Sequence, residues 1–245
     1  YVSLFIANQI KMQREKYNYG YKFGTARMKR QPILLPVTDD GTPDYEFMEN
    51  YIRAIEENIL QTYRDFVQEM YAAQVPPLNE KIWRAFFISD LFQLETGKSK
   101  GLNHLEEDAN GIPYLGATNR NNAVLTFVRP VENLIQRGNC IAFIRNGEGS
   151  IGYSVYKREE FIATSDITCG YADFLNEFIG MFITTVADKV RGKYNFNYKR
   201  SDTRLKREKL MLPVTDGGKP DFEYMEAFMK NLVANQYRRY LDFLQ

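Results

Sequence analysis

The sequence lacks the residues from which most catalytic and metal sites are built. It contains a single histidine, His104, so a histidine-based triad or a multi-histidine metal site has almost nothing to be assembled from. Its two cysteines, Cys140 and Cys169, argue against a disulfide scaffold or a cysteine-based zinc site and suit a reduced compartment. No GxxxxGK(S/T) phosphate loop and no strand–GxGxxG–helix unit occur. We therefore expect no catalytic site, no metal and no cofactor of its own.

Long apolar runs and a strong net charge are also missing. No apolar run approaches membrane-spanning length and no signal peptide is visible, so we expect a cytoplasmic protein without a membrane partner. The 245 residues carry a net charge of only +1. A nucleic-acid partner must therefore be sought in local clusters of charge.

What the sequence does contain is an internal repeat. LPVTDDGTPDYEFMENY, from Leu35, recurs as LPVTDGGKPDFEYMEAF from Leu212, and extending the match pairs residues 1–68 with 178–245, with 27 of the 68 pairs identical. The first copy has no counterpart of residues 82–177. We therefore expect a fragment of a longer two-unit protein. Its parts are predicted to be the end of a first domain (1–43), a helical spacer (44–76), a complete domain (77–214) and a second helical spacer (215–245).

Short β-rich runs and one apolar helix pattern predict a mixed α/β (α+β) fold for the complete domain. Residues 97–111 are typical of a loop, and GEGSIG at 147–152 favours a hairpin turn over a phosphate cradle. An opening strand and a turn are expected within 82–94, strands within 112–115, 124–128, 140–145, 151–156, 161–167 and 210–214, and a helix over 173–190.

Two long helices should follow the repeated turn. Asp44 and Asp221, each preceded by proline, are good N-caps. Apolar residues then recur every three or four positions, in the first helix at Met48, Ile52, Ile55, Ile59, Tyr63, Phe66 and Met70. So narrow a stripe predicts that the two helices pair with each other as a coiled coil; the alternative is that each packs on its own domain.

The positive charge is concentrated in two matched stretches that interleave cations with Tyr and Asn. Such side chains can neutralise phosphates and hydrogen-bond base edges, although an ordinary solvated surface is the alternative. Recurrence at matched positions favours function. The candidate DNA contacts are Arg191, Lys193, Asn195, Lys199, Arg200, Arg204, Lys206 and Arg207 in the second copy, and Arg14, Lys16, Lys22, Arg27, Lys29 and Arg30 in the first.

Three further loops carry the same kinds of donor. Together with the basic stretch they could form one face that reads a DNA groove, or their Asn and Gly could simply satisfy turn geometry. The candidates are Lys98 and Lys100, then Asn119, Arg120 and Asn121, then Arg145 and Asn146.

The order of these motifs resembles that of the specificity subunits of type I restriction–modification systems and of related type IIB and fused type IIG specificity units. The similarity rests on W-x-x-F-x-I-S-D-L-F-x-L-x-x-G-K (Trp83 to Lys98), on GIPYLGATNRNNAV and IAFIRNGEGSIGYS, and on L-x-L-P-V (Leu210 to Val214) before a capped helix. It spans essentially the whole chain. The truncated first domain is the departure, and it puts two-part recognition by this chain alone in doubt.

The resemblance implies a target-recognition domain that reads one half of a split DNA site, joined to a long antiparallel helical spacer. It implies three partners: double-stranded DNA, a DNA methyltransferase subunit and a restriction endonuclease subunit. S-adenosylmethionine and ATP would then belong to the partner subunits, and this chain would be non-catalytic. Two other interpretations stay open: the specificity region of a fused type IIG restriction–methyltransferase, and a helical scaffold that recruits partners without reading DNA.

Overall fold

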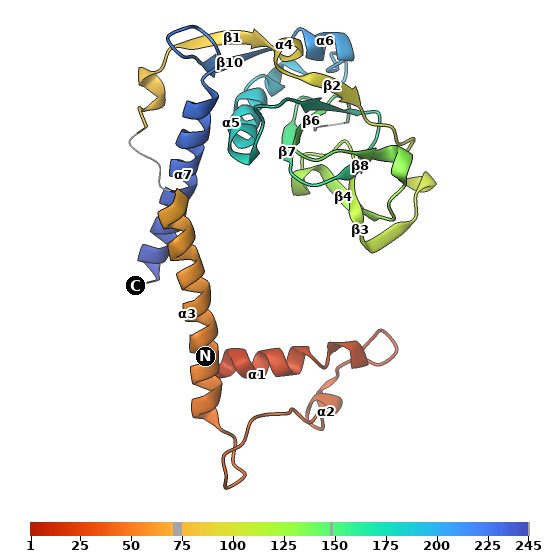
Figure 1. Cartoon of the computed structure of the whole chain (residues 1–245). Helices are drawn as coiled ribbons and strands as arrows, with labels where there is room; N and C mark the ends of the chain where they lie inside the picture. Colours follow the sequence, from red (N-terminus) through yellow and green to blue (C-terminus); the bar gives the residue numbers. More distant parts are fainter. Residues whose placement is uncertain (71–74, 148, 245) are drawn as a thin grey trace. The chain divides into compact units, whose positions relative to one another are not determined.

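Residues 1–70, 75–147 and 149–244 are described by a computed structural model of the chain, shown in Figure 1. They fall into two units. Unit 1 comprises residues 1–70 and 234–244, and unit 2 comprises residues 75–233. Within these ranges no helix has the length and apolar character needed to cross a bilayer.

Unit 2 is built on two four-stranded sheets and a two-stranded ribbon, so the mixed α/β prediction is confirmed. The first sheet is antiparallel, in the order β2 (Gln93–Thr96), β9 (Ile167–Tyr171), β6 (Cys140–Ile144), β7 (Ser154–Lys157). The second has the order β4 (Val124–Val128), β3 (Glu107–Leu115), β8 (Phe161–Ala163), β5 (Ile135–Gln136), with β3 and β8 parallel. The ribbon pairs β1 (Trp83–Phe87) antiparallel with β10 (Lys209–Pro213).

The main core of unit 2 lies between the ribbon, the first sheet and α5 (Glu177–Asp188). The apolar stripe of α5 (Ile179, Phe182, Ile183 and Ala187) is fully or almost fully buried, as a period of 3.6 residues requires. Asn176 begins the helix, because its side-chain oxygen accepts hydrogen bonds from the amides of Phe178 and Ile179 at 3.0 Å. Two short helices, α4 (Ile88–Leu91) and α6 (Asp202–Lys206), complete this core.

Both cysteines lie in the second apolar cluster, as free, fully buried side chains on β6 and β9. They contribute to this cluster as small apolar side chains.

Some of the predicted boundaries are wrong. The run at 161–167 is two strands, β8 and β9, because residues 164–166 turn between them. Residues 107–111, predicted as loop, belong to β3. The strand and turn predicted within 82–94 are confirmed as β1 and α4, and β2 follows them. β9 was hard to see because Gly170 interrupts its apolar pattern; a Cβ there would lie 2.8 Å from the ring of Phe143.

Unit 1 contains α1 (Val2–Lys11), α2 (Thr25–Met28), α3 (Tyr45–Met70) and the end of α7 (Phe222–Phe243). The predicted caps are confirmed: the amide of Phe47 donates to Asp44 Oδ1 at 2.8 Å and the amide of Tyr224 donates to Asp221 Oδ1 at 3.1 Å. Isolated bridges, Val37 to Pro43 and Val214 to Pro220, form the same turn before each helix.

The two long helices pair within unit 1, but over a shorter stretch than the sequence predicts. The ring of Tyr237 lies 5.3 Å from that of Tyr63 and 5.2 Å from that of Phe66, and Tyr240 lies 6.2 Å from Tyr63. These contacts join the last turns of α3 to the last turns of α7, and the later Phe66 meets the earlier Tyr237, so the helices run antiparallel. Ile55 and Ile59, on the same predicted stripe, remain 42% and 50% exposed.

Candidate nucleic-acid interface

Residues 191–207, which we call basic segment 2, leave the end of α5 and return to β10. They form a 3-10 turn (Arg191–Lys193), a tight turn at 195–198 and the helix α6. The backbones of Asn195 and Tyr198 exchange two hydrogen bonds, and the Asn195 side-chain oxygen accepts from the amides of Asn197 and Tyr198 at 3.0 Å. Residues 196 and 197 therefore stand at the tip of a closed turn.

Residues 14–30, basic segment 1, adopt the same local structure in unit 1. Asn18 and Tyr21 exchange the equivalent two backbone hydrogen bonds. The Arg27 guanidinium lies 4.0 Å from the Tyr21 ring centroid and donates to the Lys22 carbonyl at 2.7 Å.

The equivalent arginine of basic segment 2 makes the same pair of contacts. Arg204 lies 3.9 Å from the ring of Tyr198 and donates to the Lys199 carbonyl at 2.8 Å. Two stretches 177 positions apart thus build one arrangement, in which an arginine stacks on a tyrosine and its carbonyl bond fixes its direction.

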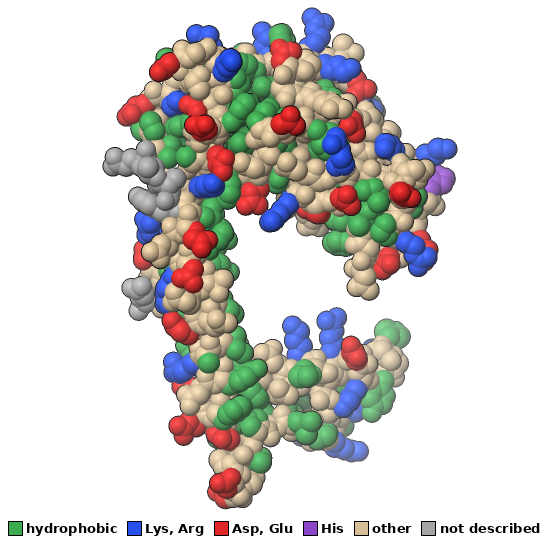
Figure 2. Space-filling view, in the orientation of Figure 1, with side chains coloured by type: hydrophobic (Ala, Val, Ile, Leu, Met, Phe, Trp, Pro, Cys, Tyr) green, Lys and Arg blue, Asp and Glu red, His purple; other side chains and the backbone are tan. Residues whose placement is uncertain are grey.

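Most of the predicted cations are exposed. In basic segment 2 the exposed ones are Lys193, Lys199, Arg204, Lys206 and Arg207, and Arg191 is half-buried. All six in basic segment 1 are exposed, and Figure 2 shows Lys and Arg side chains projecting from the part of unit 1 that Figure 1 labels α1 and α2. These positions can reach phosphates; whether they contact DNA stays a prediction.

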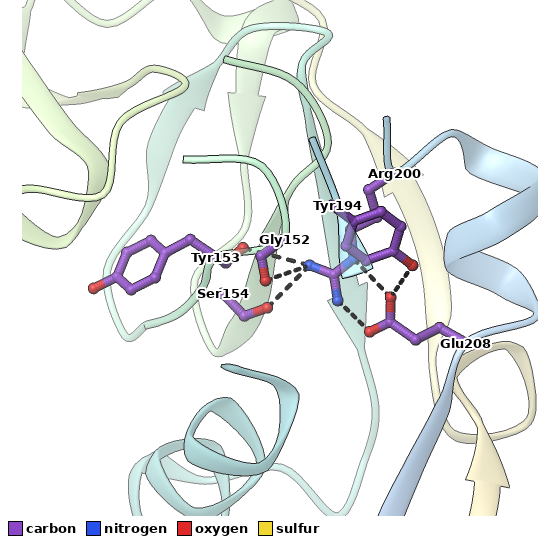
Figure 3. Close-up of polar contacts among 6 residues, drawn as sticks. All are labelled: Gly152, Tyr153, Ser154, Tyr194, Arg200 and Glu208. Carbon is purple, nitrogen blue, oxygen red and sulfur yellow. Dashed lines mark hydrogen bonds and ion pairs between the residues drawn. The ribbon is translucent and has the colours of Figure 1, made fainter. Parts of the chain in front are cut away.

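Arg200 is the exception, and its prediction as a DNA contact is wrong. Its side chain is fully buried, and Nη2 pairs with Glu208 Oε1 at 2.5 Å while Nε donates to Glu208 Oε2 at 3.1 Å. Nη1 donates to the carbonyls of Gly152 and Tyr153 and to Ser154 Oγ, as Figure 3 shows. Every guanidinium nitrogen has an acceptor inside the protein, so none is left for a phosphate.

Arg200 and Glu208 join basic segment 2 to the connection between β6 and β7. The Tyr194 hydroxyl donates to Glu208 Oε2 at 2.5 Å, and burial together with this hydrogen bond raises the pKa of Tyr194. A sequence signal for this role did exist. The counterparts of Arg200 and Glu208 in the first copy are Phe23 and Gln31, so neither charge recurs.

Arg145 and Asn146 are also engaged within the protein. Arg145 Nη1 pairs with Asp202 Oδ1 of α6 at 2.9 Å, its Nη2 donates to the carbonyl of Ser165, and its side chain is only 16% exposed. Asn146 donates to Asp166 Oδ1 at 3.1 Å. Both half-buried side chains thus hydrogen-bond between loops of the protein, and whether they contact DNA stays a prediction.

The loop at 118–122 follows the turn-geometry alternative. Asn121, Asn122 and Ala123 are three successive residues with positive φ, a conformation that Asn tolerates better than most side chains. Asn119 donates to the Gly149 carbonyl at 3.2 Å, so this loop is joined to the β6–β7 connection. Asn119, Arg120 and Asn121 are exposed there, and Lys98 and Lys100 are exposed on either side of the buried Ser99.

A hollow of about 580 Å³ separates basic segment 2 from the β6–β7 connection. Burial raises the pKa of the Asp188 carboxyl on its wall. Gly149, Ile151, Asp188, Arg191, Gly192, Tyr194, Asn195 and Phe196 line it. The structure therefore brings together basic segment 2, residues 149–151 and, through Asn119, the loop at 118–122 as neighbouring parts of one surface of unit 2.

Comparison with known proteins identifies the family of the chain. A family described as the type I restriction modification DNA specificity domain matches residues 80–239. The match covers more than half of the chain, so the chain belongs to this family, and the resemblance seen in its motifs is confirmed.

The particular relatives are specificity subunits. The type II restriction enzyme BgcI specificity subunit S.BcgI of Heyndrickxia coagulans is 27% identical over 233 residues, which are 94% of this chain and 66% of that protein. The chain thus spans slightly less than two thirds of that relative's length.

Two solved structures cover nearly the whole chain. The S subunit of a type I restriction–modification system from M. genitalium is 14% identical, with a TM-score of 0.47, over 98% of this chain and 68% of that one. The HsdS subunit from Thermoanaerobacter tengcongensis is 13% identical, with a TM-score of 0.44, over 98% of this chain and 61% of that one.

Proposed function

We propose that residues 77–214 read one half of a two-part DNA target for a restriction–modification complex and carry no catalysis themselves. The observation that supports this most is the duplicated basic segment. Both copies keep the same closed turn, the same arginine stacked on tyrosine and exposed cations at matched positions. A solvated surface would not need to preserve charge and backbone shape together.

Within this proposal the cations have two roles. Exposed lysines release counterions from DNA when they approach phosphates, and such contacts fix the register of a protein on the duplex. We assign this role to Lys193, Lys199, Lys206 and Arg207. Arg204 is held by the Tyr198 ring and the Lys199 carbonyl, so its free edge is preorganised for a directed hydrogen bond.

The helices are proposed to act as the spacer and the docking surface. α3 has 26 residues, which correspond to about 39 Å of helix, close to the length of one DNA turn. Its exposed Ile55 and Ile59 offer an apolar surface to methyltransferase and endonuclease subunits. S-adenosylmethionine and ATP would be bound by those subunits.

Equilibrium binding to duplex DNA tests the proposal. Wild-type chain should select duplexes from a random-sequence library, and its affinity should fall steeply between 50 and 200 mM salt. Lys193→Ala and Arg207→Ala should each reduce the slope of log affinity against log salt by about 0.9. Lys219→Ala, which removes an exposed lysine outside the basic segments, is the matched control and should leave the slope unchanged.

The alternatives give different results. Salt-sensitive binding with no enriched sequence would support a scaffold that recruits partners without reading DNA. A methyltransferase region encoded in the same gene would identify a fused restriction–methyltransferase. Absence of duplex binding at 50 mM salt would contradict DNA recognition outright.

A further inference from the structure

Each basic segment exposes one aromatic ring at the tip of its closed turn. Phe196 is 76% exposed and Tyr19 is 91% exposed. They are counterparts in the repeat, 177 positions apart. A single exposed apolar side chain is common on protein surfaces and needs no explanation. Two aromatic rings at the same place in two copies of a basic turn do need one.

The turn holds this ring on a rigid support. Residues 195 and 198 close the turn with two backbone hydrogen bonds, and the Asn195 side chain caps it from inside. Tyr194 stacks on Tyr198 beneath the tip with 6.0 Å between the ring centroids, and the equivalent pair Tyr17 and Tyr21 lies at 5.8 Å. The Phe196 ring is therefore presented outward by an ordered base.

The ring is accompanied by a cation in both copies. Lys199 Nζ lies 5.3 Å from the Phe196 ring centroid, and Lys22 Nζ lies 4.9 Å from that of Tyr19. Asn195 and Asn197, the immediate neighbours of Phe196, are polar and exposed. A protein-binding hot spot is normally a buried aromatic anchor in a well-packed apolar patch. This tip has the opposite surroundings, an aromatic ring among amides and positive charge, which suit a polyanion with stacked bases.

We propose that Phe196 is an apolar wedge that enters duplex DNA and stacks its ring on a base, while Lys199 moves from the ring to the adjacent phosphate. This rests on the proposed function and adds a specific contact to it. Proteins that deform DNA insert Phe, Leu, Ile or Met between base steps, and stacking on a side-chain ring strengthens binding whatever the base. The wedge supplies affinity and helps to set which base step can be opened, because deformable steps open most easily.

The wedge and the phosphate contacts are separable, because only charge contributes to the salt dependence. Phe196→Ala should weaken binding about tenfold while leaving the salt slope unchanged, since stacking on a base involves no counterion. Phe196→Tyr, which keeps an aromatic ring and reproduces the counterpart Tyr19, should retain most of the affinity. Lys199→Ala should lower the salt slope by about 0.9, whereas Phe196→Ala should leave that slope unchanged.

The experiment uses the 245-residue chain and a duplex that the wild-type chain has selected from a random-sequence library. 2-Aminopurine, a fluorescent base that brightens when it is unstacked from its neighbours, is placed at each position in turn. Wild type and Phe196→Tyr should raise the fluorescence at one step, and Phe196→Ala should not. Phe243→Ala is the matched control, because Phe243 is 83% exposed on α7 and far along the chain from the basic segments.

Each outcome decides something. If no duplex is selected, the proposed function fails and the wedge fails with it. If duplexes are selected but Phe196→Ala binds within twofold of wild type and gives the same 2-aminopurine signal, the wedge is wrong and DNA recognition stands. Equal losses for Phe196→Tyr and Phe196→Ala would also overturn the wedge, since an aromatic ring at this position would then not suffice. Phe196 contributes little to the core, so both variants are expected to fold.

Discussion

The two basic segments have nearly the same local backbone structure, but one pair of positions is charged in the second copy and uncharged in the first. Basic segment 2 is held from below by the buried ion pair of Arg200 with Glu208. The counterparts in the first copy are Phe23 and Gln31, which are both uncharged. Tyr17 nevertheless donates to Gln31 at 2.5 Å, as Tyr194 donates to Glu208 at 2.5 Å. The two copies thus differ at both positions of the pair, while the tyrosine hydrogen bond is present in each.

The difference follows from what covers the two positions. In unit 2 the carbonyls of Gly152 and Tyr153 lie over the guanidinium and accept from it, so the site is buried yet polar. Residues 1–68 include no counterpart of this connection, and Phe23 is 41% exposed beside the Tyr17 ring at 4.5 Å. A buried charge requires a partner, and removing only one member of a pair is costly. A copy that lacks one charge of this pair is therefore expected to lack the other as well.

Of the variants that test this difference between the two copies, Glu208→Ala should lose the most free energy of unfolding. The change leaves a fully buried arginine without its counter-charge, which costs about 3–5 kcal/mol, and it also removes the acceptor of Tyr194. The loss can be measured by urea unfolding followed through Trp83, the only tryptophan, which stacks on Phe182 in the core of unit 2.

Gln31→Ala is the matched control in the first copy. It removes one neutral hydrogen bond, worth about 1 kcal/mol, and it lies in unit 1, so the Trp83 transition should not move. Equal effects of the two substitutions on that transition would contradict the structural role assigned to the buried pair.

Introducing the residue types of the first copy, Phe and Gln, at positions 200 and 208 tests whether the uncharged pair can replace the ion pair. Arg200→Phe and Glu208→Gln each leave one buried charge unpaired, whereas the double variant leaves none. The double variant should therefore be more stable than the sum of the single losses by about 2 kcal/mol, within the range of coupling found for contacting residues. A double-mutant cycle on urea midpoints measures this coupling. Additive losses would show that the ion pair and its neutral counterpart are not interchangeable.

The smallest effect concerns the turn before each long helix. In the first copy the Asp40 carboxylate accepts hydrogen bonds from the side chains of Thr38 and Thr42 and from the Thr42 amide, which lowers the pKa of Asp40 to about 2. The second copy has Gly217 at this place. Because the pKa is depressed, the stabilisation is present above the ordinary carboxyl value of about 4 and is lost as pH falls through about 2.

An NMR titration of the Asp40 carboxyl carbon checks this expectation. Thr38→Val should return the pKa of Asp40 toward its ordinary value, because the hydrogen bond from the Thr38 hydroxyl to the carboxylate is removed. A midpoint near 4 in the wild-type chain would contradict the hydrogen-bonded turn.

The features that sequence could predict are those set by neighbouring residues. Asp44 and Asp221 were identifiable as caps because the bond each accepts comes from an amide three positions on. β6 was bounded to within a residue because all five of its side chains are buried and apolar. Exposure of Lys193 and Arg207 also followed from the local pattern.

The errors arise where segments distant in the sequence determine whether a side chain is buried or paired. Arg200 is buried by residues almost fifty positions earlier, and Arg145 pairs with Asp202 across a similar gap. Charge pattern alone cannot distinguish such an arginine from one that faces DNA. The comparison of the two copies could have done so, because a charge needed for DNA should recur and that of Arg200 does not.

Tethered cleavage of DNA from basic segment 2 tests the central claim most directly. Cys140 and Cys169 are buried, so a new cysteine at Lys193→Cys can be labelled selectively with an iron chelate that cuts nearby DNA. The account predicts cuts confined to one short stretch of a duplex selected by the chain, and none from the same label at Asp242→Cys on α7. Cleavage from Asp242→Cys with none from Lys193→Cys would mean that basic segment 2 faces away from DNA, and would contradict the account.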